Sequence, residues 1–270
     1  MFLVRAVFVA AAMLALPVCA QSPMPASEAE KERIRLVVKE VLREYAATLG
    51  DRQAAPAAKD LVRNLVQDNT AFMRANKPAH FQHFANAQHP RATVVSCSDS
   101  RVHMHAMDAT PDGDLFVVRN IGNQISTAEG SIEYGVHHLH TPVLLIVGHS
   151  ACGAIKAASG DYSRESAPIR RELDSIQIPR GESGMPSIRI NVNNQVRYAI
   201  GKFEEDVLSG KLTVVGAIYD FRNDLGQGHG KLHVININGE TDARRIAGMD
   251  LMQGHDAPAA KKKARASAGH

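Results

Sequence analysis

Short runs of apolar and mostly β-branched residues recur along the chain and are separated by stretches with helical periodicity. These runs predict five strands, at Ala92–Ser98, Asp114–Asn120, Val143–His149, Leu212–Asp220 and Lys231–Asn238. Runs that are apolar on both faces are typical of buried parallel strands. Because helical stretches alternate with them, the sequence predicts one α/β domain, with a mostly parallel five-stranded sheet flanked by helices.

An N-terminal helical arm is expected ahead of the sheet. A helix at Ser27–Gly50 would begin with a capping box of Ser27 and Glu30 and would stop at Gly50. Its apolar residues form one stripe, consisting of Ile34, Val37, Val38, Val41, Leu42, Tyr45 and Leu49. An Ala/Pro linker at residues 54–58 precedes a second helix at about residues 59–75. We therefore expect an arm and linker at residues 21–58 and a main domain at residues 59–252.

Two longer helices are expected within the main domain. With their capping residues they are Thr127–His140, capped by Ser126 and Glu129, and Val192–Ser209, stopped by Gly210. The segment Gly160–Ser187 is rich in Gly, Pro and charge, and is expected to be a loop with one short helix near Ile169–Ile176. Residues 253–270 form a basic tail that buries nothing and is expected to be disordered.

The first twenty residues predict export. Arg5 is followed by an apolar stretch and then by Val18-Cys19-Ala20, a small-residue cleavage pattern that makes Gln21 the first mature residue. The mature protein is therefore expected to be periplasmic or secreted, without a membrane span. An uncleaved anchor and lipidation of Cys19 remain as alternatives, although bulky Val18 argues against the lipid.

Charge and cysteine content narrow the function classes. The formal net charge of +3 includes the basic tail, so the folded part is close to neutral and has no basic stripe of the kind that nucleic-acid binding needs. Of three cysteines, Cys19 would leave with the cleaved peptide, so that Cys97 and Cys152 remain.

Metal-binding side chains follow two of the predicted strands. The segments are Cys97-Ser98-Asp99-Ser100-Arg101 and His149-Ser150-Ala151-Cys152-Gly153. Carboxyl ends of parallel strands are where α/β sheets gather their ligands. Two thiolates and one imidazole suit zinc and leave a fourth position for water, so Cys97, His149 and Cys152 predict a catalytic Zn²⁺ site. His149 and Cys152 would share a helical face if the turn after Gly148 opens a helix.

Simpler interpretations of these residues remain. Cys97 and Cys152 could form a disulfide in an oxidising compartment or act as a redox pair, but His149 has no role in either. Asp99 and Arg101 could be a surface ion pair of little energetic value. The other histidines that resemble a metal cluster are taken as partly exposed helix and loop residues, namely His103, His105, His137, His138 and His140.

These segments, together with residues 113–123 and Ser131–Val136, resemble the β-class carbonic anhydrases over about residues 61–238. The resemblance implies zinc ligation by Cys97, His149 and Cys152, and a catalytic dyad of Asp99 and Arg101. It also implies a substrate pocket that includes Gln88, Phe116 and Tyr134. In this family the amino-terminal helices wrap around a partner subunit, so a homodimer or higher homo-oligomer is expected.

The implied reaction is the zinc-dependent, reversible hydration of carbon dioxide to bicarbonate and a proton. Hydrolysis of carbonyl sulfide or carbon disulfide on the same scaffold is the nearest alternative, and a catalytically inactive zinc-bearing or disulfide-bonded structural protein is another. Some family members have a bicarbonate-closed form and a Trp three residues before the first ligand. This chain has Val94 there and no Trp. Asp99 is therefore expected to stay paired with Arg101.

Overall fold

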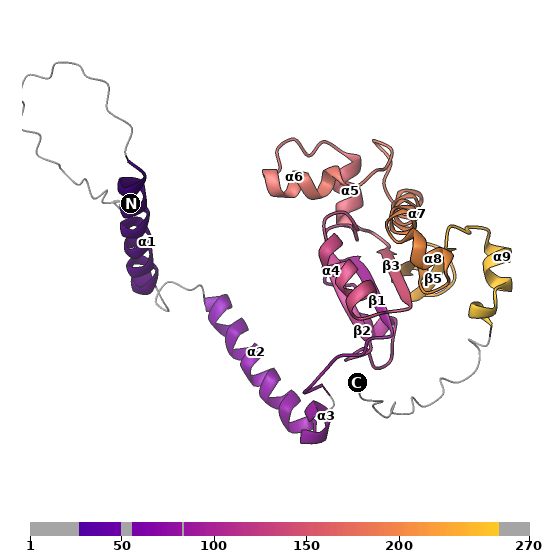
Figure 1. Ribbon diagram of the computed structural model, residues 1–270, viewed down its shortest axis with the longest axis horizontal. Coiled ribbons are helices and arrows are strands. Elements are labelled where there is room, and N and C mark those ends of the chain that lie inside the picture. Colours follow the sequence, from indigo (N-terminus) through magenta and orange to yellow (C-terminus); the bar gives the residue numbers. More distant parts are fainter. Residues whose placement is uncertain (1–26, 50–55, 83, 254–270) are drawn as a thin grey trace, which may run out of the picture. The chain divides into compact units, whose positions relative to one another are not determined.

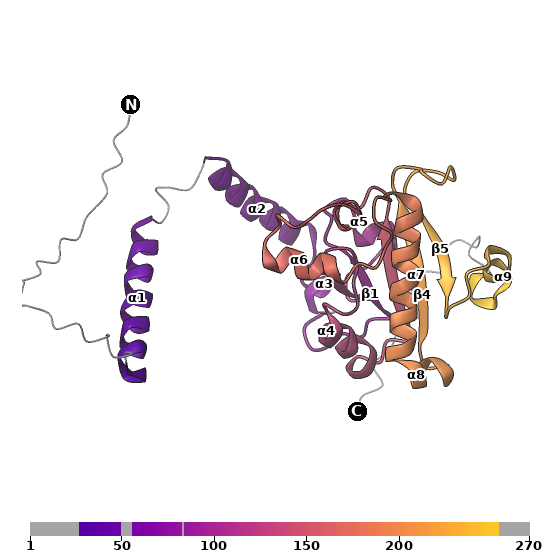
Figure 2. The same ribbon diagram turned by 90° about the horizontal axis from the view of Figure 1, so that it is seen from above.

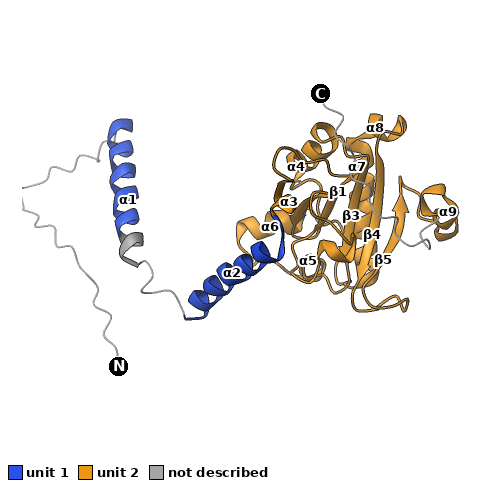
Figure 3. Cartoon of the chain, turned by 90° about the horizontal axis from the view of Figure 1, so that it is seen from below, with its two compact units in different colours: residues 1–77 blue, residues 78–270 orange. Residues whose placement is uncertain are grey.

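The structure is a computed structural model of the 270-residue chain, and it describes residues 27–49, 56–82 and 84–253. The chain divides into two units, residues 1–77 and residues 78–270 (Figure 3). The predicted signal peptide at residues 1–20, the stop at Gly50 and nearly all of the basic tail lie outside the described residues.

The described part of the first unit contains two helices, α1 (Glu28–Leu49) and α2 (Pro56–Ala75). The predicted capping box opens α1, since the Ser27 N–H donates to Glu30 Oε2 at 3.3 Å and the Glu30 N–H donates to Ser27 Oγ at 3.2 Å. The second helix begins earlier than expected because Pro56, whose fixed φ suits a first helical position, starts it. Both helices expose large apolar side chains, among them Val41 and Val66 at 57% and 63%.

The second unit is built on one five-stranded sheet with the order β2-β1-β3-β4-β5 (Figure 1). The strands are β1 (Ala92–Cys97), β2 (Leu115–Asn120), β3 (Val143–His149), β4 (Thr213–Asp220) and β5 (Lys231–Ile237). The first four in spatial order are parallel, and β5 pairs with β4 in the antiparallel sense. The predicted fold class, a mostly parallel five-stranded sheet flanked by helices with a helical N-terminal region, is confirmed.

The helix α7 (Met185–Lys202) runs along one face of the sheet over β3 and β4 (Figure 2). Glycines in the strands let it approach closely, because a Cβ at Gly148 would lie 2.6 Å from Val192 and one at Gly216 would lie 2.8 Å from Val196. The same face buries the core side chains of α4 (Glu129–Glu133) and α5 (Gly153–Ser159). The remaining elements are α3 (Pro78–Gln82), η1 (Met104–Ala106), η2 (Tyr134–His138), α6 (Ala167–Asp174), α8 (Glu204–Leu208), α9 (Ala243–Gly248) and η3 (Asp250–Met252).

Two helix predictions are corrected by the structure. The segment expected to be one α-helix at residues 127–140 is the short α4 followed by the π-helix η2, and Ser126 does not cap it. The Glu129 carboxylate, expected to complete a capping box, instead accepts hydrogen bonds from the Tyr198 hydroxyl and, at 3.5 Å, from Lys202 Nζ. The other expected helix begins at Met185 rather than at residue 192, and ends at Lys202 before α8 begins.

None of the helices in the described ranges is long and apolar enough to cross a membrane.

Candidate metal centre

Three side chains that can bind metal converge at the carboxyl ends of two neighbouring strands. Cys97 is the last residue of β1, His149 is the last residue of β3, and Cys152 immediately precedes α5. Their two Sγ atoms and one imidazole nitrogen all lie within 4.8 Å of one another. His149 is 0% exposed and each cysteine is 5% exposed. This is the arrangement expected from the parallel register, which sets the ends of β1 and β3 side by side.

The turn between His149 and Cys152 differs from the prediction. The two residues do not share a helical face, because β3 continues through His149 and Cys152 has extended backbone angles, φ −65° and ψ 119°. The chain reverses at Ala151, whose φ of +52° is unusual for a residue with a Cβ. The extended strand end and this turn, rather than a helix, bring the Cys152 thiol back to His149.

The His149 ring is held with one nitrogen facing the two thiols. Nδ1 lies 3.0 Å from the Ser150 carbonyl, which can only accept, so the N–H is on Nδ1 and Nε2 carries the free lone pair. Nε2 is buried and has no hydrogen-bond partner among the described residues. The Phe221 ring stacks on the imidazole at 6.0 Å between centroids. A buried acceptor without a donor, next to two thiols, fits a metal ligand.

The two thiols form a coupled pair. A hydrogen bond from Cys152 lowers the pKa of Cys97, assisted by hydrogen bonds from the backbone N–H groups of Gly122 and Asp99 that outweigh the opposing effect of burial. The same thiol pairing, together with burial, raises the pKa of Cys152. The first proton of the pair is therefore released readily and the second is held. A metal ion that binds both sulfurs displaces both protons.

Asp99 and Arg101 lie directly beside this cluster and form a bidentate ion pair. Arg101 Nε donates to Asp99 Oδ1 at 2.8 Å, and a terminal nitrogen donates to Oδ2 at 2.6 Å. The guanidinium also donates to the Ala151 carbonyl at 3.1 Å and stacks on Phe221. Hydrogen bonding from Arg101 holds the pKa of Asp99 well below its usual range. Because Asp99 Oδ2 lies 3.9 Å from His149 Nε2, an ionised carboxylate faces the centre of the cluster.

Two residues outside the predicted site hold these side chains in place. Arg119, on β2, donates from its guanidinium to the carbonyls of Cys97, Asp99 and Val102 at 2.7–3.1 Å. Phe221 covers both the His149 ring and the Arg101 guanidinium. Arg119 lies within a segment that the sequence singles out, residues 113–123, whereas Phe221 carries no sequence signal that separates it from a core aromatic.

The predicted substrate residues are not brought to the metal ligands within one chain. Phe116 and Tyr134 contact each other at 5.9 Å between ring centroids. Phe116 pairs with Thr93, whereas Cys97 pairs with Asn120, four residues further along β2, or about 13 Å at the usual rise per residue. Gln88 is exposed in the segment that leads into the amino end of β1.

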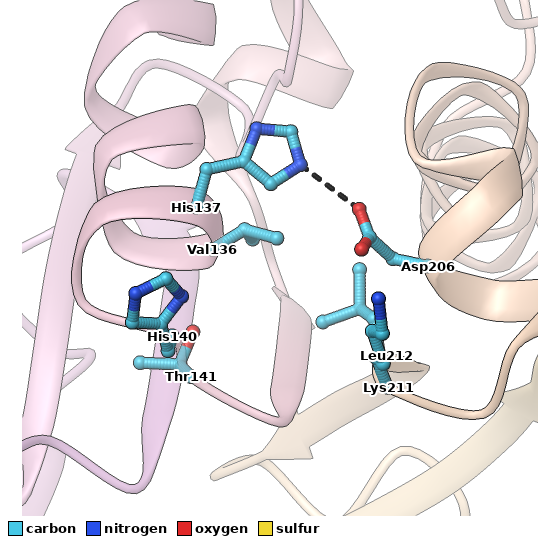
Figure 4. Close-up of a pocket in the computed structure, with 7 residues that line it drawn as sticks. All are labelled: Val136, His137, His140, Thr141, Asp206, Lys211 and Leu212. Atoms are coloured by element: carbon cyan, nitrogen blue, oxygen red, sulfur yellow. Dashed lines mark hydrogen bonds and ion pairs between the residues drawn. The ribbon is translucent and has the colours of Figure 1, made fainter.

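The remaining histidines that resemble a metal cluster are exposed side chains of helices and loops. Within the described residues, Cys97, His149 and Cys152 are the one group of three potential ligands whose donor atoms lie close together. His137 instead pairs with Asp206 at 2.9 Å, at the edge of a cavity of about 450 Å³ that His140 and Lys211 also line (Figure 4). This cavity lies where β3 and β4 begin, at the end of the sheet opposite to the cysteines.

Comparison with known proteins agrees with this geometry. A family model described as carbonic anhydrase matches residues 92–227, the segment that contains all three potential ligands and the Asp99–Arg101 pair. The chain belongs to the β-class carbonic anhydrases. The carbonic anhydrase of Mycolicibacterium smegmatis is 39% identical over 176 residues, which are 57% of this chain and 85% of that one.

Other carbonic anhydrases are similar over different lengths. The carbonic anhydrase of Synechococcus elongatus is 38% identical over 105 residues, 35% of this chain and 39% of the relative. One of two tetrameric β-carbonic anhydrases of Sordaria macrospora superposes with a TM-score of 0.55 at 23% identity, covering 66% of this chain and 98% of that one. At 23% identity, this structural similarity supports a shared fold and nothing more specific.

Proposed function

We propose that this protein catalyses the reversible hydration of carbon dioxide to bicarbonate and a proton, with one Zn²⁺ held by Cys97, His149 and Cys152. The observation that carries the proposal is the buried cluster itself, two thiols and an imidazole Nε2 that has no other partner among the described residues. Two thiolates and one imidazole are a donor set that zinc prefers, and three protein ligands leave one position open.

When bound, zinc supplies a Lewis acid that lowers the pKa of a coordinated water, to about 7 in the well-known case of a carbonic anhydrase with three histidine ligands. In this chain the Asp99 carboxylate is the group that would orient the water. An ionised carboxylate can only accept, so Oδ2 would take a hydrogen bond from the water O–H and fix where its lone pair points. Arg101 holds both oxygens of Asp99 through its planar fork, and thus keeps the carboxylate ionised and in one orientation.

The substrate pocket is proposed to include Gln88, Phe116 and Tyr134. Apolar rings suit a small apolar substrate, and an amide N–H suits the oxygen of bicarbonate that carries charge. Because Phe116 lies about 13 Å along β2 from the residue that pairs with Cys97, these side chains can reach a metal centre only in another subunit. The proposal therefore requires a homo-oligomer.

The division of roles can be tested with two variants and one control. Cys97→Ser should lose zinc, because it removes a ligand. Asp99→Asn should retain about one zinc per chain and lose the rate of carbon dioxide hydration, because it removes only the acceptor beside the ligands. Asp114→Asn is the matched control, since Asp114 has the same bidentate pairing with Arg91 at the other end of the sheet.

Metal analysis and stopped-flow hydration assays, with carbonyl sulfide as a second substrate, measure these outcomes. Wild-type protein that contains no zinc, with Cys97 and Cys152 joined as a disulfide, would refute the proposal. Equal zinc loss in Cys97→Ser and Asp99→Asn would refute the separate roles. Turnover of carbonyl sulfide without hydration of carbon dioxide would reassign the reaction.

We also propose that the protein is exported and cleaved after Ala20. The support is the order of a basic residue, an apolar stretch and a small-residue cleavage pattern in residues 1–20. Intact-mass measurement on the extracytoplasmic fraction should give a chain that begins at Gln21. A cytoplasmic chain that still begins at Met1 would contradict export, and an added lipid mass on Cys19 would indicate an anchored form.

A further inference from the structure

A buried network of side-chain amides lies behind the metal ligands and connects α7 to the turn after β2. Its members are Gln124, Asn191 and Gln195, none more than 5% exposed. Gln124 Nε2 donates to the Gly122 carbonyl at 2.6 Å and to Asn191 Oδ1 at 2.9 Å. Asn191 Nδ2 donates to the same Gly122 carbonyl at 3.0 Å. Two buried side chains therefore donate hydrogen bonds to one backbone carbonyl.

Gln195 completes the network. Gln195 Nε2 donates to Gln124 Oε1 at 2.8 Å, and Gln195 Oε1 accepts from the Ile125 N–H at 2.8 Å. Each amide thus fixes the orientation of the next. Fully satisfied buried polar networks specify one conformation, because any rearrangement leaves buried donors or acceptors unpaired.

The carbonyl that accepts these two hydrogen bonds belongs to Gly122, which contacts the proposed metal ligand Cys97. Gly122 lies two residues after Asn120, the β2 partner of Cys97, and its backbone N–H donates to the Cys97 sulfur. Gly122 has a φ of +80°, and a Cβ there would lie 2.7 Å from the end of the Ile176 side chain, so the position favours glycine. Glycine has the freest backbone of all residues, and its N–H direction must be fixed by other groups.

The rest of the turn is tied to the same ligand. Asn120, the β2 partner of Cys97, accepts the Ser98 N–H at 2.9 Å through its carbonyl. Its side chain binds both backbone groups of Gln124, accepting from N–H at 2.7 Å and donating to the carbonyl at 2.6 Å. The amide network, the turn and the Cys97 sulfur are therefore one connected unit.

We propose that Asn191 and Gln124 are positioning residues of the metal centre, which hold the Gly122 N–H on the Cys97 sulfur. The inference rests on the proposed zinc site. A hydrogen bond to a ligand sulfur withdraws electron density from it and directs its lone pairs, so these residues set the geometry and the bond strength of one metal ligand from outside the ligand shell.

The test compares Asn191→Leu with Asn194→Leu. Asn194 is the matched control, because it lies on the same helix and also donates to a backbone carbonyl, that of Gln177 at 2.7 Å, but is not one of the amides that bind the Gly122 carbonyl. Asn191→Ser, which keeps a donor of smaller reach, serves if Asn191→Leu does not fold. Zinc release to a chelator should be about 10- to 100-fold faster in the Asn191 variants.

A spectroscopic readout separates positioning from general loss of stability. In the cobalt-substituted protein, loss of a hydrogen bond to Cys97 makes the sulfur a better electron donor, so the thiolate-to-cobalt absorption band should move to longer wavelength. Asn194→Leu should leave both the band and the release rate at wild-type values. If wild-type protein binds metal and the Asn191 variants match Asn194→Leu in both measurements, the inference is wrong and the proposed function is unaffected. Wild-type protein that takes up neither zinc nor cobalt would overturn the proposed function and this inference with it.

Discussion

The substitution Asp220→Asn tests how the turn that covers the metal centre is held. Asp220 ends β4 and is 0% exposed. Its Oδ1 accepts from the Asp224 N–H at 3.0 Å and its Oδ2 accepts from the Leu225 N–H at 2.8 Å. Both oxygens therefore face backbone donors. An asparagine has one oxygen and one NH₂ group, so one backbone N–H must face another donor.

The cost follows from this count. Hydrogen bonds to charged groups contribute about 1.5–3 kcal/mol each, and an unsatisfied buried donor costs about 1–3 kcal/mol. Asparagine retains one neutral hydrogen bond, so Asp220→Asn should lower the free energy of unfolding by about 2–4 kcal/mol. Asp224→Asn is the control, because Asp224 is exposed and its carboxylate pairs with Arg222 at 3.3 Å, so this substitution should cost about 0–1 kcal/mol.

Urea unfolding of the zinc-loaded protein at pH 7 and fixed protein concentration measures both values. The pKa of Asp220 is lowered in the fold, because hydrogen bonds from Leu225, Asp224 and Ser150 outweigh the opposing effect of burial. A lowered folded pKa stabilises the protein above the unfolded pKa, and this advantage is lost as pH falls through the folded value. The difference between wild type and Asp220→Asn should therefore shrink below about pH 4. A loss under 1 kcal/mol at pH 7, equal to that of the control, would refute the reasoning.

Three further predictions concern the dyad, the arm and the metal. Arg101→Lys replaces a bidentate fork by a single point charge, and should keep zinc while lowering the hydration rate by about tenfold or more. Metal analysis and stopped-flow assays measure the two outcomes. A hydration rate equal to that of wild type would contradict the orienting role of Arg101. Deletion of residues 27–49 removes the exposed apolar stripe of α1 and should reduce the mass in solution by light scattering, whereas an unchanged mass would show that this helix does not hold the oligomer. Removal of zinc by a chelator should lower the melting temperature in calorimetry, and re-addition should restore it, because binding to the native state alone stabilises that state.

The sheet could be predicted closely because its signal is local. Runs such as Val143–His149 are apolar on both faces and are bounded by residues that end strands. The structure has a strand with the same first and last residues. The convergence of Cys97 with His149 also followed from sequence, since parallel strands bring their carboxyl ends together.

Other features depend on distant partners and could not be predicted. Glu129 does not cap its own helix because Tyr198 and Lys202, about seventy residues away, compete for its carboxylate. The π-helix at Tyr134–His138 also contacts a distant part of the chain. A Cβ at Gly135 would lie 2.1 Å from Thr93 Oγ1, so the helix is pressed directly onto β1. No periodicity along the chain encodes such a contact.

Asn191 and Gln124 illustrate the same limit at the metal centre. As isolated letters they are polar residues that favour the surface, and Asn191 lies one residue before the helix start expected from the sequence. Only the folded structure shows that the side-chain amides of these two residues hydrogen-bond to each other.

The ligands also have a consequence for folding kinetics. Cys97 and His149 are adjacent in space, yet β2, α4 and η2 lie between them in the chain. Contacts between residues so far apart in the chain are costly in loop-closure entropy, so we expect the complete ligand set to form late in folding. An interaction absent from the transition state slows unfolding without speeding folding. Zinc bound at the proposed site would therefore slow unfolding and lengthen the lifetime of the native state, while the rate of refolding would stay the same.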